Sequence, residues 1–230
     1  MVNTDQGDSY LVQGKLPCPK CTSSDAYHVY SNGWGHCYSC AVNIPEDVES
    51  TAREVAPMQA GLIPKGEHTY LKKRKIDADT CQFWDYTVSE YKGSTVQVAN
   101  YKDKSGATIA QKIRLPDKSF KFLGDTKNIP LYGQWLWSSG GKMVTIFEGE
   151  LDAISGSQTQ GNRYPCVSIP TGAQGAVKAV TQNIEWLLTF DRVNIMFDMD
   201  EAGKEAALKV AALFPPRKAH IGVLPHKDAS

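Results

Sequence analysis

Two carboxylates separated by one residue, Asp198 and Asp200, stand between an apolar run and a helix-forming run in the segment FDMDEAGKEA. One carboxylate before a helix is sufficient for an N-cap. A second acid at a spacing of two points to the same side of an extended segment, where it repels the first unless a cation lies between them. The pair therefore has two interpretations, a metal site or acids that only begin a helix.

Further acids follow other apolar runs in the same way. Glu148 comes directly after MVTIF, and Asp228 comes shortly after GVLP. The strands of an α/β sheet bind ligands outside their carboxyl ends, so these acids are expected at one edge. Carboxylate oxygens suit Mg²⁺, which takes few of them and keeps waters for phosphate. The spacing favours a magnesium site, with capping and turn acids as the alternative.

Four of the six cysteines form two close pairs, CPKC (Cys18 and Cys21) and CYSC (Cys37 and Cys40), with fifteen residues between the pairs. Each C-x2-C turn can aim two thiolates at one ion, and two such turns complete a tetrahedral sulfur site that suits zinc. Four sulfurs leave no position for water, so this zinc would be structural and the module would need it to fold. Two disulfides are a weaker alternative, because nothing suggests export. A redox pair is weaker still, because one C-x2-C motif would suffice for it.

The residues between the cysteine pairs, SNGWGHCY, place Trp34, His36 and Tyr38 among glycines on an expected hairpin. Exposed aromatic side chains on a small zinc ribbon can stack on unpaired bases. The alternative is that Trp34 covers the metal site, and the sequence favours neither interpretation over the other.

The composition bounds the class of protein. Of the 230 residues 41% are hydrophobic, enough for a core, and the formal net charge of +0 indicates no partner. No apolar run reaches the length of about 18 residues needed for a membrane span, and the polar N-terminus is unlike a signal peptide. We expect a soluble protein in a reducing compartment, with Cys81 and Cys166 as small core residues.

The composition changes along the chain, and it predicts different structural elements in different segments. Residues 1–45 are dense in Cys, Gly, Ser and aromatic residues, and residues 46–67 have the composition of a linker, with one short helix near 48–55. From about residue 68 the chain predicts an α/β unit. It starts with an antiparallel hairpin, in which TVQVANYKD and TIAQKIRL alternate around Lys104-Ser105-Gly106.

After residue 140, predicted strands and helices alternate. The strands are MVTIF, PCVSIP, VNIMF and HIGVLP. One helix begins at LDAISGS, a second follows PCVSIP and runs through Gln182, and the third is EAGKEAALKVAALF, which Pro215-Pro216 ends. Strands that alternate with helices predict a mostly parallel sheet with helices covering its faces.

The segment FEGELDA followed by FDMDEAGKEA resembles the Toprim fold shared by primases and topoisomerases. Nearly the whole chain resembles the primase half of the bifunctional primase–helicases of T-seven-like bacteriophages, because the cysteine module, LKKRKIDADTC, QVANYKDKSG, QKIRLPDKSF, LYGQWLW and VLPHKDA stand in the expected order. The resemblance implies an α/β fold with a zinc ribbon (1–45), a linker (46–67), a basic α+β subdomain of an RNA polymerase domain (68–139) and a Toprim domain truncated at its C-terminus (140–230).

The resemblance implies a DNA primase that copies a short recognition sequence in single-stranded DNA into an oligoribonucleotide. The resemblance also assigns the family's functional roles to residues of this sequence. The catalytic acids are Glu148, Asp198 and Asp200, which with Asp228 would bind one or two Mg²⁺ ions. The nucleotide- and DNA-binding residues are Arg74, Lys112 and Lys118, joined by Arg114 from the same basic tract. The ribbon residues that would read the template are Asn32, Trp34 and His36, although relatives carry Asp and His at the first two positions.

The charge pattern agrees with a surface that attracts phosphate. Between residues 92 and 127 only Asp103, Asp117 and Asp125 oppose a set of basic residues: Lys92, Lys102, Lys104, Lys112, Arg114, Lys118, Lys121 and Lys127. A second basic cluster is Lys72-Lys73-Arg74-Lys75. The alternative is a solvated charged face.

The resemblance also implies partners and a location. The partners are single-stranded DNA, ribonucleoside triphosphates, a replicative helicase, fused or separate, and the phage DNA polymerase, but no membrane; the location is the cytoplasm of an infected bacterium. The chain has no G-x4-G-K-[ST], so we expect a fragment or a separately encoded primase.

Two alternatives stay open, a non-catalytic module that binds single-stranded DNA and a Toprim nuclease. The same-face acids favour a primase over the first, and the zinc ribbon with QKIRLPDKSF favours it over the second. A topoisomerase would need a domain with a nucleophilic tyrosine, for which the sequence gives no indication.

Overall fold

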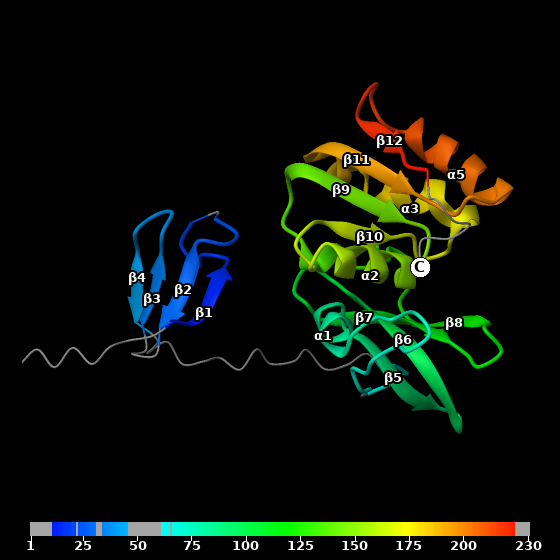
Figure 1. Cartoon of the computed structure of the whole chain (residues 1–230), viewed down its shortest axis with the longest axis horizontal. Helices are drawn as coiled ribbons and strands as arrows, with labels where there is room; N and C mark the ends of the chain where they lie inside the picture. Colours follow the sequence, from blue (N-terminus) through cyan, green and yellow to red (C-terminus); the bar gives the residue numbers. More distant parts are fainter. Residues whose placement is uncertain (1–10, 22, 31–33, 46–60, 65, 224–230) are drawn as a thin grey trace, which may run out of the picture. The chain divides into compact units, whose positions relative to one another are not determined.

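The computed structural model describes residues 11–21, 23–30, 34–45, 61–64 and 66–223. The chain divides into two compact units, Met1–Pro57 and Met58–Ser230 (Figure 1). In the described part of the chain, no helix combines the length and the apolar character that crossing a bilayer requires. The short helix expected near residues 48–55 lies outside the described residues.

The first unit is an antiparallel sheet of four strands in sequence order, β1 (Leu11–Leu16), β2 (Tyr27–Tyr30), β3 (Trp34–Cys37) and β4 (Asn43–Pro45). Side chains alternate along β3, so Trp34 and His36 lie on one face and Gly35 and Cys37 on the other. Only glycine fits at position 35, because a Cβ there would overlap the Tyr27 hydroxyl on β2.

The second unit begins with helix α1 (Ala78–Phe83), which Asp77 caps by accepting a hydrogen bond from the Thr80 amide at 2.6 Å. An antiparallel sheet follows in sequence order, β5 (Tyr86–Tyr91), β6 (Ser94–Lys102), β7 (Thr108–Arg114) and β8 (Phe120–Gly124). The expected hairpin is confirmed, since β6 and β7 pair on either side of the turn at residues 103–107.

A parallel sheet forms the rest of the second unit, with the order β10-β9-β11-β12. Its strands are β9 (Gly141–Phe147), β10 (Cys166–Ser168), β11 (Phe190–Met196) and β12 (Ala219–Ile221). The helices are α2 (Glu150–Thr159), α3 (Ala176–Gln182), α4 (Ile184–Leu188) and α5 (Glu201–Ala211), with short 3-10 turns η1 (Gln134–Leu136) and η2 (Ala173–Gly175). The alternating pattern expected after residue 140 is confirmed.

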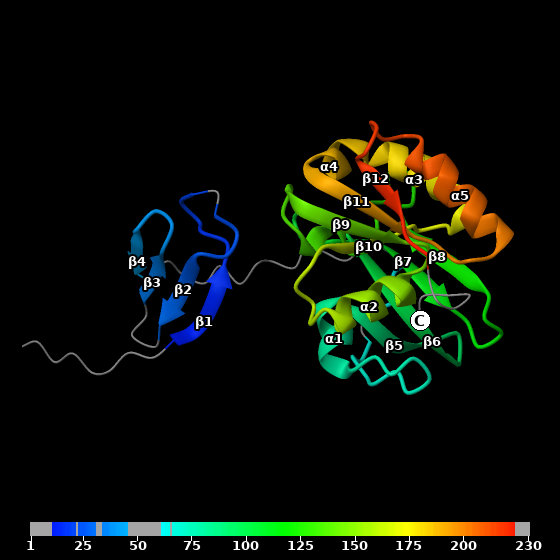
Figure 2. The same ribbon diagram turned by 45° about the horizontal axis from the view of Figure 1, so that its top comes forward.

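Two of the apolar cores of this unit surround its parallel sheet. Helices α3, α4 and α5 pack on one face of the parallel sheet, around residues such as Val144, Ile195 and Val210. Helix α2 packs on the other face and lies between the parallel and antiparallel sheets (Figures 1 and 2). Cys81 and Cys166 are fully buried in this second core, as expected from the sequence. Helix α2 is therefore the element shared by both halves of the unit.

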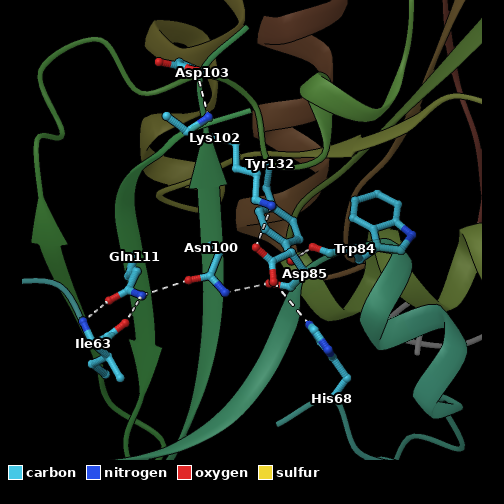
Figure 3. A network of polar contacts seen from close by, with 10 residues as sticks. Ile63, His68, Trp84, Asp85, Asn100, Lys102, Asp103, Gln111 and Tyr132 are labelled. Carbon is cyan, nitrogen blue, oxygen red and sulfur yellow. Dashed lines mark hydrogen bonds and ion pairs between the residues drawn. The ribbon is translucent and has the colours of Figure 1, made fainter. Parts of the chain in front are cut away.

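Polar contacts hold Ile63 against β7 and His68 beside Asp85, the residue before β5 (Figure 3). The buried Gln111 amide accepts a hydrogen bond from the Ile63 amide at 2.7 Å and donates one to the Ile63 carbonyl at 3.0 Å. Gln111 also donates to Asn100, and His68 lies 3.2 Å from Asp85. The residues that composition assigned to the end of the linker therefore pack on β7.

Candidate metal and nucleotide site

The four paired cysteines of the first unit converge on one point. The Sγ atoms of Cys18 and Cys40 lie 3.8 Å apart, as do those of Cys21 and Cys37, and all four lie within 4.8 Å of one another. A tetrahedron of sulfurs at a Zn–S distance of about 2.3 Å has edges of about 3.8 Å. The separations are too long for disulfides, at about 2.05 Å, and all six cysteines are free. The cluster therefore fits a zinc ion.

Trp34 and His36 lie on the face of the ribbon sheet opposite Cys37. Trp34 is 48% exposed there. The Tyr38 ring stands edge-on to His36 at 4.7 Å, and the His36 ring nitrogen Nδ1 lies 2.6 Å from the Asn43 side-chain oxygen. Because Trp34 and Cys37 occupy opposite faces, the geometry favours an exposed stacking surface over a cover for the metal. Asn32, the other expected template residue, lies outside the described residues.

The sequence interpretation did not include His28 and Tyr30 in this surface. In the register of β2 and β3, His28 stands opposite His36, and Tyr30 stands opposite Trp34. Their side chains therefore share the face of the expected template residues. The alternation of YHVY was the available signal, but the pairing of the two strands was needed to use it.

Two of the expected acids come together at the carboxyl edge of the parallel sheet. Strands β9 and β11 pair up to Phe147 and Met196, so Glu148 and Asp198 leave the sheet nearly side by side. The Glu148 carboxylate accepts hydrogen bonds from the Asp198 amide at 3.4 Å and from the Ala173 amide at 3.3 Å. The strand order switches between β9 and β11, because β9 is followed by β10 on one side and β11 is followed by β12 on the other. Such switch points are where open α/β sheets bind ligands.

Asp200 is the N-cap of α5, and its carboxylate accepts a hydrogen bond from the Gly203 amide at 2.9 Å. A Cβ on residue 203 would lie 2.3 Å from the Asp198 carbonyl oxygen, so glycine allows α5 to start against Asp198. Among the described side chains, the four thiols form the one group of three or more ligands close enough to share an ion. Asp228 lies outside the described residues. The structure therefore gathers Glu148 and Asp198, while Asp200 begins the helix.

Lys112 of β7 reaches the start of α2. Its Nζ donates to both Glu150 oxygens, at 2.9 and 3.0 Å, and to the Pro170 carbonyl at 2.8 Å. The Tyr101 hydroxyl donates to Glu150 at 2.5 Å. Burial, followed by the charge of Glu150, raises the pKa of Tyr101 well above its ordinary value, so the phenol stays protonated. Sequence reasoning missed the role of Glu150, because its partners are 38 and 49 residues away.

The other expected basic residues, Arg74, Arg114 and Lys118, line one pocket of about 440 Å³. Lys72 and Lys73 lie in the same wall, and Leu151 of α2 contributes an apolar side chain. The Arg114 guanidinium lies over the Phe120 ring at 5.7 Å, and Arg74 lies 3.8 Å from Asp152 of α2. Residues 44 positions apart in the chain are thus gathered into a concave surface that can attract phosphate.

A parallel sheet with acids at its switch point, a basic antiparallel sheet and a four-thiol ribbon define a Toprim-type protein with a metal-binding module. Residues 66–124 match the family model "Bacteriophage T7 DNA helicase/primase, N-terminal a+b fold", and residues 145–230 match the Toprim-like model. The chain belongs to the family of T7-like phage DNA primase–helicases, within which it corresponds to the primase part.

Three relatives match between 71% and 98% of this chain. The crystal structure of the primase fragment of the bacteriophage T7 primase–helicase is 34% identical, with a TM-score of 0.68 over 96% of this chain and 93% of that one. The T7 primase domains solved with lagging-strand DNA polymerase are 39% identical, with a TM-score of 0.68 over 71% of this chain and 83% of that one. The DNA helicase/primase of Enterobacteria phage T3 is 37% identical over 98% of this chain, which spans 42% of that relative.

Proposed function

We propose that this chain is a DNA primase, which makes short oligoribonucleotides on a single-stranded DNA template by metal-dependent nucleotidyl transfer. The observation that carries the proposal is the junction at the start of α2. Glu148 leaves β9 two residues before Glu150, which binds Lys112, and Leu151 then lines the basic pocket. Phosphoryl transfer needs mainly positioning and electrostatic stabilisation, which an acidic edge beside basic side chains can supply.

The metals of the proposed enzyme are one structural Zn²⁺ on the four cysteines and one or two Mg²⁺ at the acidic edge. Glu148 and Asp198 would hold the Mg²⁺, together with Asp200 and Asp228. When bound, such an ion polarises the phosphate and lowers the pKa of the attacking 3′-hydroxyl. Arg74, Arg114 and Lys118 would bind and orient phosphate groups of nucleotide or template, and Lys112 would contact the incoming triphosphate.

The relatives suggest the substrates and partners. The T7 primase domains were solved bound to an RNA/DNA hybrid and dTTP, in contact with a DNA polymerase, and the T3 relative is a helicase/primase. For this chain we propose a single-stranded DNA template, ribonucleoside triphosphates, a phage DNA polymerase and a replicative helicase. The ribbon face with Trp34, His36 and Asn32 would read the template. The site of action would be the cytoplasm of an infected bacterium.

The test is a primer-synthesis assay with Mg²⁺, labelled ribonucleoside triphosphates and a pool of single-stranded templates. Wild type should make short labelled oligoribonucleotides, and Asp198→Ala should make none while it still binds the template. Asp191→Ala is the matched control, because Asp191 is an exposed acid at the other end of the same strand, β11. It should keep wild-type synthesis.

Other outcomes of this assay identify the alternatives. Template binding by the wild type without any product would indicate the non-catalytic DNA-binding module. Cleavage of the template, abolished by Asp198→Ala, would indicate a Toprim nuclease. Equal loss of template binding and synthesis in Asp198→Ala would assign Asp198 a structural role.

A further inference from the structure

The ammonium group of Lys112 is held in one orientation by a full set of partners. It has three N–H donors, and the three acceptors are the two Glu150 oxygens and the Pro170 carbonyl. The Lys112 side chain is only 11% exposed. The Phe120 ring, 4.7 Å from Nζ, adds a cation–π contact. A lysine fixed in this way behaves as a placed charge and not as a mobile surface group.

Stability alone does not explain this arrangement. A buried ion pair loses hydration on both partners, and an apolar pair of the same volume is often equally stable. Glu150 is nevertheless held by a further buried group, the Tyr101 hydroxyl. Glu150 is also the first residue of α2, where the helix dipole favours a negative charge. The Tyr101 hydrogen bond and the position at the start of α2 thus hold the Glu150 carboxylate in place against Lys112.

The same network reaches the acidic edge through one short turn. Pro170 binds Lys112 through its carbonyl, and three residues later the Ala173 amide donates to Glu148. Gly172 lies between them with φ 66° and ψ −165°, a conformation essentially limited to glycine. A contiguous chain of contacts therefore fixes Lys112 relative to Glu148, and through Glu148 to the Asp198 amide.

We propose that Glu150, supported by Tyr101, is a positioning residue that holds the Lys112 ammonium at the acidic edge, where it meets the triphosphate of the incoming nucleotide. The phosphate replaces the neutral Pro170 carbonyl, while both Glu150 oxygens stay in place. Correct placement of a charge before the reaction is a major source of rate enhancement. The inference rests on the proposed function, since it names the task of a residue within the same site.

The test is a double-mutant cycle in primer synthesis, with Lys112→Met, Glu150→Gln and the double variant. Loss of Lys112 should reduce kcat/KM for the nucleotide by about 10²- to 10³-fold, as for other removed electrostatic contacts. Glu150→Gln should reduce it by about tenfold, and the double variant should be no worse than Lys112→Met. If the two losses multiply, Glu150 does not act through Lys112 and the inference is wrong.

Melting temperatures and one further variant separate positioning from folding. The double variant removes both charges of the buried pair, so it should regain melting temperature relative to Glu150→Gln while it stays as inactive as Lys112→Met. If activity follows the melting temperature, the pair is only structural. Glu205→Gln is the matched control, because it breaks an exposed pair with Lys209 at 2.7 Å, and it should change neither quantity.

A nucleotide-binding measurement keeps this inference separate from the proposed function. If the wild type makes no primer, the proposed function is refuted but the inference about Glu150 is not. Calorimetry with ATP and Mg²⁺ then provides the cycle. Glu150→Gln should weaken ATP binding, and the double variant should bind ATP no more weakly than Lys112→Met. If Glu150→Gln leaves the affinity for ATP unaltered, or if the wild type does not bind ATP, the inference is wrong.

Discussion

At the scale of single residues, Asp198 and Asp200 illustrate how one short motif serves two needs. Asp198 lies at the sheet edge beside Glu148, whereas Asp200 starts α5 through its hydrogen bond to the Gly203 amide. A carboxylate that caps a helix keeps one oxygen for another partner. The two interpretations of the sequence are therefore compatible, and substitutions can separate them.

Two substitutions of Asp200 should separate its contribution as a helix N-cap from the contribution of its negative charge to the site. Asp200→Ala should lower the free energy of unfolding by about 1 kcal/mol, because alanine cannot cap, whereas Asp200→Asn should keep most of it. Both should lose primer synthesis, because neither carries the negative charge that would bind Mg²⁺. Urea unfolding and the synthesis assay measure the two effects, and full activity in Asp200→Asn would limit Asp200 to capping.

At the scale of elements, the turn between β10 and α3 is as important as the strands. Pro170 and Ala173 bind Lys112 and Glu148, and Gly172 gives the turn its shape. Turns of this kind cannot be recognised from apolar periodicity, which reports strands and helices only.

Gly172→Ala should therefore impair the site from a position that carries no functional group. The substitution forces a side chain into a strained conformation at a cost of about 1–3 kcal/mol. A displacement of about 1 Å at Lys112 or Glu148 should reduce primer synthesis by up to about a hundredfold. Gly161→Ala is the control, since Gly161 has φ 64° but lies after α2, and it should lose stability with activity retained. Equal activity loss in both variants would contradict the prediction.

The exposed face of the ribbon sheet should bind bases by stacking. Trp34→Ala should weaken binding of single-stranded DNA by about tenfold or more, because stacking of a base on an aromatic ring contributes about 1–3 kcal/mol. Fluorescence anisotropy measures the affinity. Tyr164→Ala removes an equally exposed aromatic side chain from the second unit, and it should have no effect. If Trp34→Ala leaves the affinity for single-stranded DNA unchanged, Trp34 has only a structural role.

At the scale of the whole molecule, the chain forms two compact units, and we expect them to have separate tasks. Cys37→Ser or zinc chelation should unfold the ribbon, because the four thiolates need a common ion to stay close together. The second unit should keep its melting temperature. Template-directed initiation should be lost while extension of a supplied primer persists, and loss of extension as well would refute this division.

The parts of the fold predicted from the sequence are those encoded by local patterns. Cysteine spacing predicts the four-thiol cluster, and apolar runs with acids at their ends predict the parallel sheet and the edge with Glu148 and Asp198. The pair of Lys112 and Glu150 was not predicted, because it depends on how two sheets pack around α2. Packing of Leu62 and Ile63 was missed for a similar reason, since the polar composition, the prolines and the lack of aromatic residues around them suggested a linker.

The turn at residues 170–173 also has a thermodynamic consequence. It contacts Lys112 at one end and Glu148 at the other, so a ligand that moves either end perturbs the partner at the other. Occupancy by an anion at the lysine and by a cation at the carboxylate should then be linked. Linkage is reciprocal, so whatever factor the cation adds to anion affinity, the anion must add to cation affinity. A turn of four residues would make the site cooperative within a single subunit.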